Sequence, residues 1–563
     1  MLTCRIVSCM QNTSTVIPHR IDDIPLLIAV IKHLGLNTIL ANLVPTHGNT
    51  TYHCLLSNGE AICIWLVYLI SQGDHRKWKM DEWVATHSAI LTRLWGAAVV
   101  PGDFSDDRLT TLASYLGDDM IAAAIDLVLG EQTVSLADLD HLRLDATGFT
   151  GYHAVSAGAL MQFGHSKGGP AECTQYKLMA AATGAGQYVA GQFHPGQCAD
   201  DPLYVPLLAQ LFRLCSTAGM LFLGDSKMGA LTTRRYIEQH QHYYYMPLSL
   251  ASITSEQWGK LVDAAVSGEL PGFMPVWRED DLLGYGFEFI RVLSWGGTLW
   301  EERVQVIRSL SHAAAEHKAL ERRIASTCHG LEQLTPPSKQ GVKSYREEAA
   351  LRQQVTERLD RVHLQGIVEV TIREEAAKTK GKPPRYVIAT VQVNAEALRT
   401  SEHRSGWRCF VTTAPPARLS LADGMLLYRQ GAGQGVERMN QILKAHDTLG
   451  FDRLYVHTDT QLRGLGYLMT LALRMIMHIE ITIRTSLADE GKALPDYYPN
   501  GLTSTKPTTK TMLERITFRG VTLLETWDHE GQAHRYLTPL PTILLEMLRH
   551  LKLDSSVYTQ LLE

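Results

Sequence analysis

The sequence is poor in cysteine and has no segment that marks an oxidising compartment. Its 9 cysteines in 563 residues are scattered singly, with no C-x-x-C pair. This distribution argues against a disulfide framework and against a cysteine-based zinc site, and it indicates a reducing compartment. The opening residues contain no basic region followed by a long apolar run. We therefore expect no signal peptide and a cytoplasmic protein.

No apolar run is both long and uninterrupted enough to predict a membrane span. The stretch Ala61–Ile70 is too short to cross a bilayer. The longer stretch Tyr467–Ile483 carries Arg474, His478 and Glu480. Both stretches are therefore predicted to be buried helices of a soluble protein.

The chain also lacks an excess of positive charge. Its 53 Lys and Arg residues are outnumbered by 58 Asp and Glu residues, which gives a net charge of −5. Such a balance is not typical of a nucleic-acid-binding protein, although phosphate contacts need only a local positive surface. Hydrophobic residues make up 45% and charged residues 20%, as in ordinary globular proteins. The length predicts roughly three or four domains.

Helical patterns dominate residues 1–138. Ser57 and Glu60 form the capping-box pattern of a helix start. Residues 73–79 (GDHRKWK) are basic and aromatic and lie between predicted helices. They could grip DNA or a second subunit, or form a solvated loop, and the sequence leaves these alternatives open. Further helices are predicted at Asp81–Trp95, Asp106–Leu116 and Asp119–Leu129.

Between residues 139 and 255 the periodicity changes to that of an α/β fold. Leu142 and Leu144 alternate with Arg143 and Asp145, which is a strand pattern. A hairpin, a helix, a buried strand, a second helix and another strand should follow, which indicates a mixed sheet with helices on its faces. Their expected bounds are Tyr176–Thr183, Tyr188–Phe193, Pro202–Leu214, Gly219–Gly224, Thr232–His240 and His242–Leu250.

Residues 256–405 are predicted to form an antiparallel helical pair followed by a hairpin. Apolar residues keep helical spacing in segments 304–320 and 351–362. Strands are predicted at Ile367–Ile372 and Tyr386–Val393. The loop between these strands is either a basic tip that follows a DNA backbone or a solvated loop. Its cationic residues are Lys378, Lys380, Lys382 and Arg385.

Two further segments, residues 406–490 and 491–563, complete the chain. The first should contain a helix from about Gly435 and a long apolar helix from Leu465. The second should contain a hairpin and a terminal helix. These are expected at Val521–Thr526, Ala533–Leu537 and Pro541–Leu551.

Three acidic residues are candidates for a metal-dependent site. Asp145 and Asp225 each follow an apolar strand pattern, and carboxylates at neighbouring strand ends can share a divalent cation. Glu437 and Lys444 stand two helical turns apart on one face. Two Mg²⁺ ions roughly 3.5–4 Å apart, held by such carboxylates, can clamp the attacking and leaving oxygens of a phosphoryl transfer. The alternatives are turn-forming or capping aspartates and a solvated helix face.

A series of short blocks runs through most of the chain. In order they are IPHRIDDIPLL, VPTHGN, GDHRKWKMDEWVATH, FSDDRL, LRLDATGFTGYH, FGHSKG, CADDPLY, LFLGDSKMGAL, LRGLGYLMTLALRMIMHIE and HRYLTPL. Together they resemble insertion-sequence DDE transposases whose last carboxylate sits in a Y-R-E-K signature. The resemblance implies that Asp145, Asp225 and Glu437 are the catalytic, metal-binding triad.

The same resemblance implies a domain organisation. A ribonuclease-H-like core would comprise residues 139–255 and 406–490. An insertion at 256–405 would interrupt it, an all-helical domain at 1–138 for DNA binding or dimerisation would precede it, and residues 491–563 would form a C-terminal segment.

The resemblance also assigns residues to the signature and to phosphate contacts. The signature residues would be Tyr428, Arg429 and Lys444, and weaker candidates for phosphate contacts are Lys227 and Lys167. The spacing departs from the signature, because Gly433 stands at the expected arginine position and the glycine-rich run GAGQG precedes Glu437. Either the tyrosine and arginine reach the site from an altered loop, or this copy is impaired.

A member of this family would cut transposon ends and transfer the freed 3′-hydroxyl to target DNA, using two Mg²⁺ ions for which Mn²⁺ can substitute. It would act on terminal inverted repeats as a homodimer or higher homo-oligomer, in a prokaryotic cytoplasm and on the nucleoid when bound to DNA. Two alternatives stay open. One is a catalytically impaired or domesticated DNA-binding relative, and the other is a ribonuclease-H-like endonuclease without strand transfer.

Overall fold

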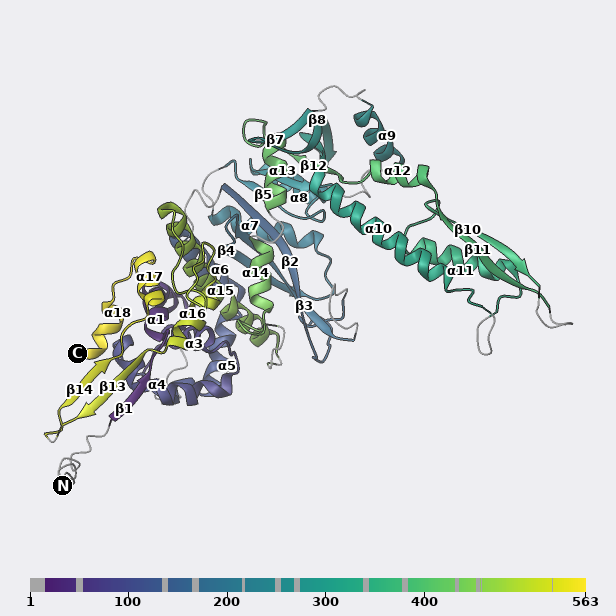
Figure 1. Ribbon diagram of the computed structural model, residues 1–563. Helices are drawn as coiled ribbons and strands as arrows, with labels where there is room; N and C mark the ends of the chain where they lie inside the picture. Colours follow the sequence, from purple (N-terminus) through teal and green to yellow (C-terminus); the bar gives the residue numbers. More distant parts are fainter. Residues whose placement is uncertain are drawn as a thin grey trace. The chain divides into compact units, whose positions relative to one another are not determined.

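The chain forms two compact units in the computed structural model. The first unit consists of Met1–Tyr243 and Gln430–Glu563, and the second of Tyr244–Arg429. Each unit combines helices and strands (Figure 1). The structure describes residues 16–46, 54–133, 140–164, 172–214, 218–248, 255–267, 274–337, 344–376, 383–430, 435–451, 456, 458–528 and 530–563.

A mixed sheet forms the centre of the first unit. Its strands are β2 (His141–Gly151), β3 (Thr174–Thr183), β4 (Tyr188–Pro195) and β5 (Leu221–Leu223). They lie in the order β4-β3-β2-β5, with antiparallel pairing throughout except that β2 and β5 are parallel. The chain returns beside β5, where the Tyr243 amide donates to the Met220 carbonyl at 2.7 Å. This arrangement is compatible with the ribonuclease-H-like core expected from the sequence.

Helices cover this sheet and carry residues of the candidate site. They are α7 (Tyr204–Leu214), α8 (Leu231–Gln239) and α14 (Val436–Lys444). α7 packs on β3 and β4, whereas α14 packs on β2 and β3 (Figure 1). The buried residues Val436, Met439 and Leu443 lie three and four positions apart along α14. This spacing gives the short helix one apolar face, and that face packs on the sheet.

The long helix α15 (Asp459–Glu490) belongs to the hydrophobic core of the first unit. The Thr458 hydroxyl caps its start by accepting a hydrogen bond from the Gln461 amide at 3.3 Å, and Gly491 ends it in a left-handed conformation with φ of +62°. Among the described residues it is the one unbroken helix long and apolar enough to cross a membrane, but 83% of its apolar window is buried inside the protein. The prediction of a buried helix here is confirmed.

The region before the sheet is mostly helical, but the prediction that it is all helical is wrong. β1 (Val16–Arg20) pairs antiparallel with β13 (Thr522–Trp527), which also pairs with β14 (Ala533–Leu537). Local periodicity misses β1 because its partner comes from the far end of the chain. The helices before the sheet are α1 (Ile24–His33), α2 (Leu36–Leu43), α3 (Asn58–Gln72), α4 (Met80–Trp95), α5 (Asp106–Leu116) and α6 (Asp119–Thr133). The C-terminal segment adds α16 (Thr509–Arg519), α17 (Thr542–His550) and α18 (Ser556–Thr559).

The predicted capping box at the start of α3 is confirmed. The Ser57 hydroxyl accepts a hydrogen bond from the Glu60 amide at 3.3 Å, and the Glu60 carboxylate accepts one from the Ser57 amide at 2.9 Å. Two amides at the helix start that lack helical partners are thereby satisfied.

The second unit contains an antiparallel sheet in the order β6-β12-β9-β8-β7. Its strands are β6 (Tyr243–Pro247, whose first residue belongs to the first unit), β7 (Met274–Arg278), β8 (Asp281–Trp295), β9 (Thr298–Ser309) and β12 (Trp407–Thr412). The prediction of a helix from residue 304 is wrong in its first turns, since Val304 and Ile307 lie in β9 and α10 begins only at Leu310. Residues 303–307 are all buried, so both faces of β9 are covered in this segment.

A helical pair and a hairpin in the second unit share a small core of their own. They are α10 (Leu310–Glu332), α11 (Glu348–Arg361), β10 (Val368–Glu375) and β11 (Arg385–Val393), and they agree with the predicted pair and hairpin. The core residues are Leu320, Leu331, Tyr345, Leu351, Val355, Leu359, Leu364 and Val368. Three other helices complete the unit, α9 (Ser255–Val266), α12 (Ala395–His403) and α13 (Leu421–Gln430).

A buried ion pair joins α15 to α6 and provides a test of this core. The Arg474 guanidinium donates to Asp126 Oδ1 at 2.7 Å, and the two side chains are only 4% and 1% exposed. We expect Arg474→Met to lower the free energy of unfolding by about 3–5 kcal/mol, because it leaves a buried carboxylate without its counter-charge. Chemical denaturation of the full chain measures this change.

Arg463→Met is the matched control for that measurement. Arg463 lies on the same helix but pairs with an exposed carboxylate, that of Asp119, at 3.5 Å. Exposed pairs contribute little to stability, so this variant should lose little beyond about 1 kcal/mol for the hydrogen bond that Arg463 donates to the Phe193 carbonyl at 2.8 Å. Equal losses in the two variants would contradict the role assigned to the buried pair.

Candidate active site

The pairing of β2 with β5 brings two acidic residues to neighbouring positions. The parallel register aligns His141 with Leu221 and Arg143 with Leu223. Asp145 and Asp225 each follow the last of these pairs by two residues, and the charges of both act on the Tyr204 hydroxyl. Asp145 is not the last residue of its strand, as the sequence suggested, because β2 continues to Gly151 paired with β3. It lies where the parallel pairing ends.

Neutral hydrogen-bond donors fix the carboxylate of Asp225. The Tyr204 hydroxyl and the Lys227 amide both donate to Oδ1, each at 2.9 Å. Burial, followed by the charges of Asp225 and Asp145, raises the pKa of the Tyr204 hydroxyl far above its usual range. Tyr204 therefore stays protonated and keeps donating, and both aspartates lie close enough to it to act on its charge.

A third carboxylate nearby is held by cations. Asp200 accepts ion pairs from Lys177 Nζ at 2.6 Å and from Lys227 Nζ at 3.0 Å. Burial alone would raise the pKa of Asp200, but the two lysines outweigh it and lower that pKa. The bond to Asp200 raises the pKa of Lys227 in turn. Lys227 thus touches the candidate site through its backbone, while its ammonium is paired with Asp200.

α14 lies on the same face of β2 as Asp145. The Asn440 amide donates to Asp145 Oδ2 at 3.3 Å. Glu437 is exposed and precedes Asn440 by three residues, so the two lie about one helical turn apart along α14. At the other end of the helix, Lys444 Nζ lies 5.4 Å from the ring centroid of Phe149 on β2. Glu437 and Lys444 therefore lie near opposite ends of a helix whose middle contacts Asp145 through Asn440.

The described part of the chain contains no ready-made group of three or more His, Cys, Asp or Glu side chains able to hold a metal ion. The two aspartates are the fixed part of the candidate site, and Glu437 belongs to its exposed side. Carboxylate oxygens are the ligands that Mg²⁺ prefers, and the neutral donors that fix Asp225 leave its charge available to a cation. The donor types present thus suit a hard divalent ion.

Two of the other predicted site residues belong to the second unit, and the rest lie wholly or in part outside the described residues. Tyr428 belongs to the second unit, where its ring packs against Phe410 with centroids 4.6 Å apart and its hydroxyl accepts from Arg408 at 3.4 Å. Arg385, in the same unit, is paired with Glu375 at 2.5 Å and donates to the Pro336 carbonyl. Arg429 is the last but one residue of α13, and its side chain lies outside the described part of the chain. Residues Lys167, Lys378, Lys380, Lys382 and Gly433 also lie outside it.

Sequence reasoning missed Tyr204, Asn440 and Asp200. Tyr204 starts a helix that looks like an ordinary amphipathic one, and only the fold brings its hydroxyl to Asp225. Asn440 carried a detectable signal, since it is a polar residue on the apolar face of α14, between Met439 and Leu443. A buried polar residue requires a partner, and here the partner is Asp145.

Comparisons with known proteins return only weak structural likenesses. No family model matches the chain, and no curated protein matches it. Among solved structures, a chain in the cryo-EM structure of the piggyBac transposase synaptic complex with hairpin DNA is 9% identical, with a TM-score of 0.36 over 96% of this chain and 85% of that chain. At this TM-score the likeness does not establish a shared fold or a shared activity.

Tyr204→Phe tests whether the hydroxyl prepares Asp225 for a cation. Removing the donor should weaken Mn²⁺ binding by about tenfold, the usual effect of deleting a group that orients a metal ligand. Electron paramagnetic resonance of free Mn²⁺ measures the affinity. The control is Tyr236→Phe, because Tyr236 stacks on Phe212 in the same unit. Unchanged affinity in Tyr204→Phe would remove Tyr204 from the site.

Proposed function

We propose that this chain is a DNA transposase of the DDE type, which cleaves DNA at transposon ends and joins them to target DNA. The observation that carries the proposal is the parallel register of β2 and β5, which leads to Asp145 on one chain and Asp225 on the other two residues beyond its last pair, while α14, which bears Glu437, packs on β2. Carboxylates so arranged, with a cation between them, suit in-line displacement at phosphorus. The sequence resemblance to transposases with the Y-R-E-K signature supports the same reading.

In this proposal each residue of the site has a distinct role. Asp145 and Asp225 are the principal ligands of two Mg²⁺ ions, and Glu437 completes the set from α14. Bound Mg²⁺ would stabilise charge on the phosphate oxygens and favour deprotonation of the attacking hydroxyl. Asn440 and Tyr204 orient the two aspartates through the bonds described above. Lys444 is exposed at the end of α14 and would hold a phosphate oxygen of the DNA.

The proposal includes duplex DNA and a second copy of the chain as partners. Phosphate contacts would come from Lys444 and from the basic segment between β10 and β11, so binding should weaken as salt rises. Assembly of two copies on paired transposon ends would match the expected homodimer. The departure at Gly433 favours one rival, a DNA-binding relative that no longer cleaves.

Removing a carboxylate charge tests the proposal most directly. Asp225→Asn and Glu437→Gln should each slow Mg²⁺-dependent cleavage by about a hundredfold or more, because they remove charge that stabilises the transition state. DNA binding should stay close to that of the wild type. The assay uses a supercoiled plasmid that carries the DNA flanking the gene, with nicking and linearisation followed on gels.

Asp201→Asn is the matched control, since it removes one exposed carboxylate just ahead of α7. It should cleave as the wild type does. Pre-cleaved ends with a free 3′-hydroxyl separate transfer from cleavage, and joined products distinguish a transposase from a nuclease. A wild-type chain that binds these ends but never cuts would instead identify the non-cleaving relative. Cleavage that survives in Asp225→Asn would refute the site.

A further inference from the structure

The helix that carries Glu437 has little to hold it in place on its own. α14 has nine residues, and its N-cap residue, Gly435, makes no side-chain capping bond and has φ of +82°. Isolated helices shorter than about 12–15 residues are marginal in water. The rotation of α14 about its axis must therefore be set by contacts with the rest of the first unit.

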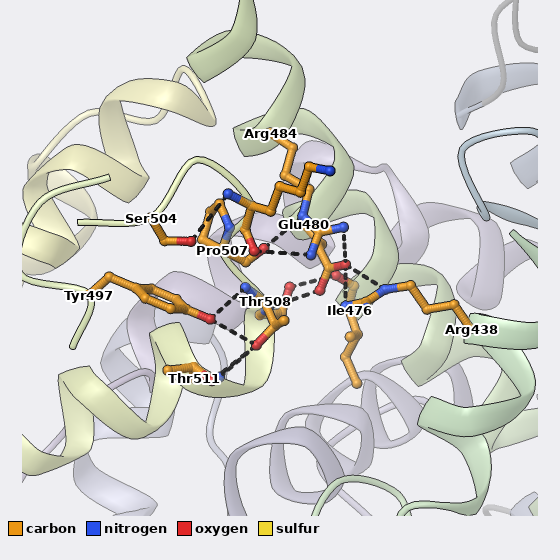
Figure 2. Close-up of polar contacts among 11 residues, drawn as sticks. Arg438, Ile476, Glu480, Arg484, Tyr497, Ser504, Pro507, Thr508 and Thr511 are labelled. Carbon is orange, nitrogen blue, oxygen red and sulfur yellow. Dashed lines mark hydrogen bonds and ion pairs between the residues drawn. The ribbon is translucent and has the colours of Figure 1, made fainter. Parts of the chain in front are cut away.

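One of these contacts is a buried carboxylate, Glu480 of α15, which is 1% exposed (Figure 2). Its Oε1 atom accepts from Arg438 Nε at 2.8 Å, and the same guanidinium lies 2.5 Å away through its NH2 group. Arg484, one turn along α15, adds a second ion pair at 2.9 Å. The Thr509 amide donates to Oε2 at 3.1 Å, so both oxygens of the carboxylate are engaged.

Glu480 and Arg484 also contact the start of α16 (Thr509–Arg519), where several hydrogen bonds hold the chain. Thr509 opens α16, so Glu480 places a negative charge at a helix N-terminus, where the helix dipole stabilises it. Arg484 also donates to the Pro507 carbonyl at 2.8 Å. The Thr508 hydroxyl caps α16, and the Tyr497 hydroxyl accepts from the Thr508 amide at 3.0 Å (Figure 2). Glu480 is thus a fixed anchor.

The position of Arg438 makes this anchor relevant to the candidate site. Arg438 directly follows Glu437 in the chain, and Asn440 follows two residues later. Residues 438 and 440 point about 200° apart around a helix. The Arg438–Glu480 pair and the Asn440–Asp145 bond therefore hold α14 from nearly opposite sides, and Glu437 lies between them. These two contacts restrict the rotation of α14 about its axis, and that rotation sets the direction of the Glu437 side chain.

We propose that Glu480 and Arg438 are positioning residues that aim Glu437 at the ion held by Asp145 and Asp225. This inference rests on the proposed function. Neither residue touches the substrate. Two nitrogens of the planar Arg438 guanidinium converge on Oε1 of Glu480, and this contact restricts direction as well as distance.

The test compares Arg438→Gln, Arg438→Lys and a control, Arg515→Gln, in the full-length protein. Arg515 also forms a buried pair with a carboxylate, that of Asp496 at 2.8 Å, but this pair lies between α16 and the segment before it. Arg438→Gln should bind Mn²⁺ about tenfold more weakly and lose kcat, with KM for DNA unchanged. Arg438→Lys should recover part of both, and Arg515→Gln should match the wild type in both even though its melting temperature falls.

Two further measurements separate positioning from general loss of stability. Hydrogen exchange of the α14 amides should quicken in Arg438→Gln and not in Arg515→Gln. If Arg438 acts through Glu437, adding Arg438→Gln to Glu437→Gln should not weaken Mn²⁺ binding further. A full additional tenfold loss in the double variant, or equal behaviour of Arg438→Gln and Arg515→Gln, would overturn the inference. If the wild type neither binds Mn²⁺ nor cuts DNA, the proposed function fails. Hydrogen exchange in α14 would still show whether the Arg438–Glu480 pair holds this helix in place.

Discussion

The candidate site depends on one register, the parallel pairing of β2 with β5. Because neighbouring strands keep their alignment, this pairing decides which residues come next beyond its last pair, Arg143 with Leu223, and two residues further along each chain lie Asp145 and Asp225. A slip of one residue would turn one aspartate to the opposite face of the sheet. The buried residues of both strands, among them Leu142, Leu144 and Phe222, oppose such a slip. The packing of apolar residues in β2 and β5 thus helps to determine where the two aspartates lie.

The carboxylates of the first unit differ in whether their partners are neutral or positively charged. The donors to Asp225 are neutral, whereas Asp200 and Glu480 are each bound by two cations. An ion pair balances the charge of a carboxylate locally, whereas hydrogen bonds from neutral donors do not. The acidic residues of the unit therefore divide into those that hold the structure together and those that remain available for a ligand.

Local patterns in the sequence predicted those elements whose two faces differ. The alternation in β2, the apolar stripe of α14 and the capping box at Ser57 were all visible, because each depends on residues close together in the chain. β9 was misread since both of its faces are buried, and β1 was missed since its partner is β13. In the site, the aspartates could be chosen from strand patterns. Tyr204 could not, because its link to Asp225 exists only after folding.

The division of the chain has a consequence for synthesis. Unit 2 is inserted between β5 and α14, so the ribosome makes both aspartates, then all of unit 2, and only then Glu437. At roughly 5–20 residues per second, the nascent protein carries two acidic positions without the third for many seconds. Under the function proposed above, the nascent chain would therefore have no complete site until Glu437 had been made.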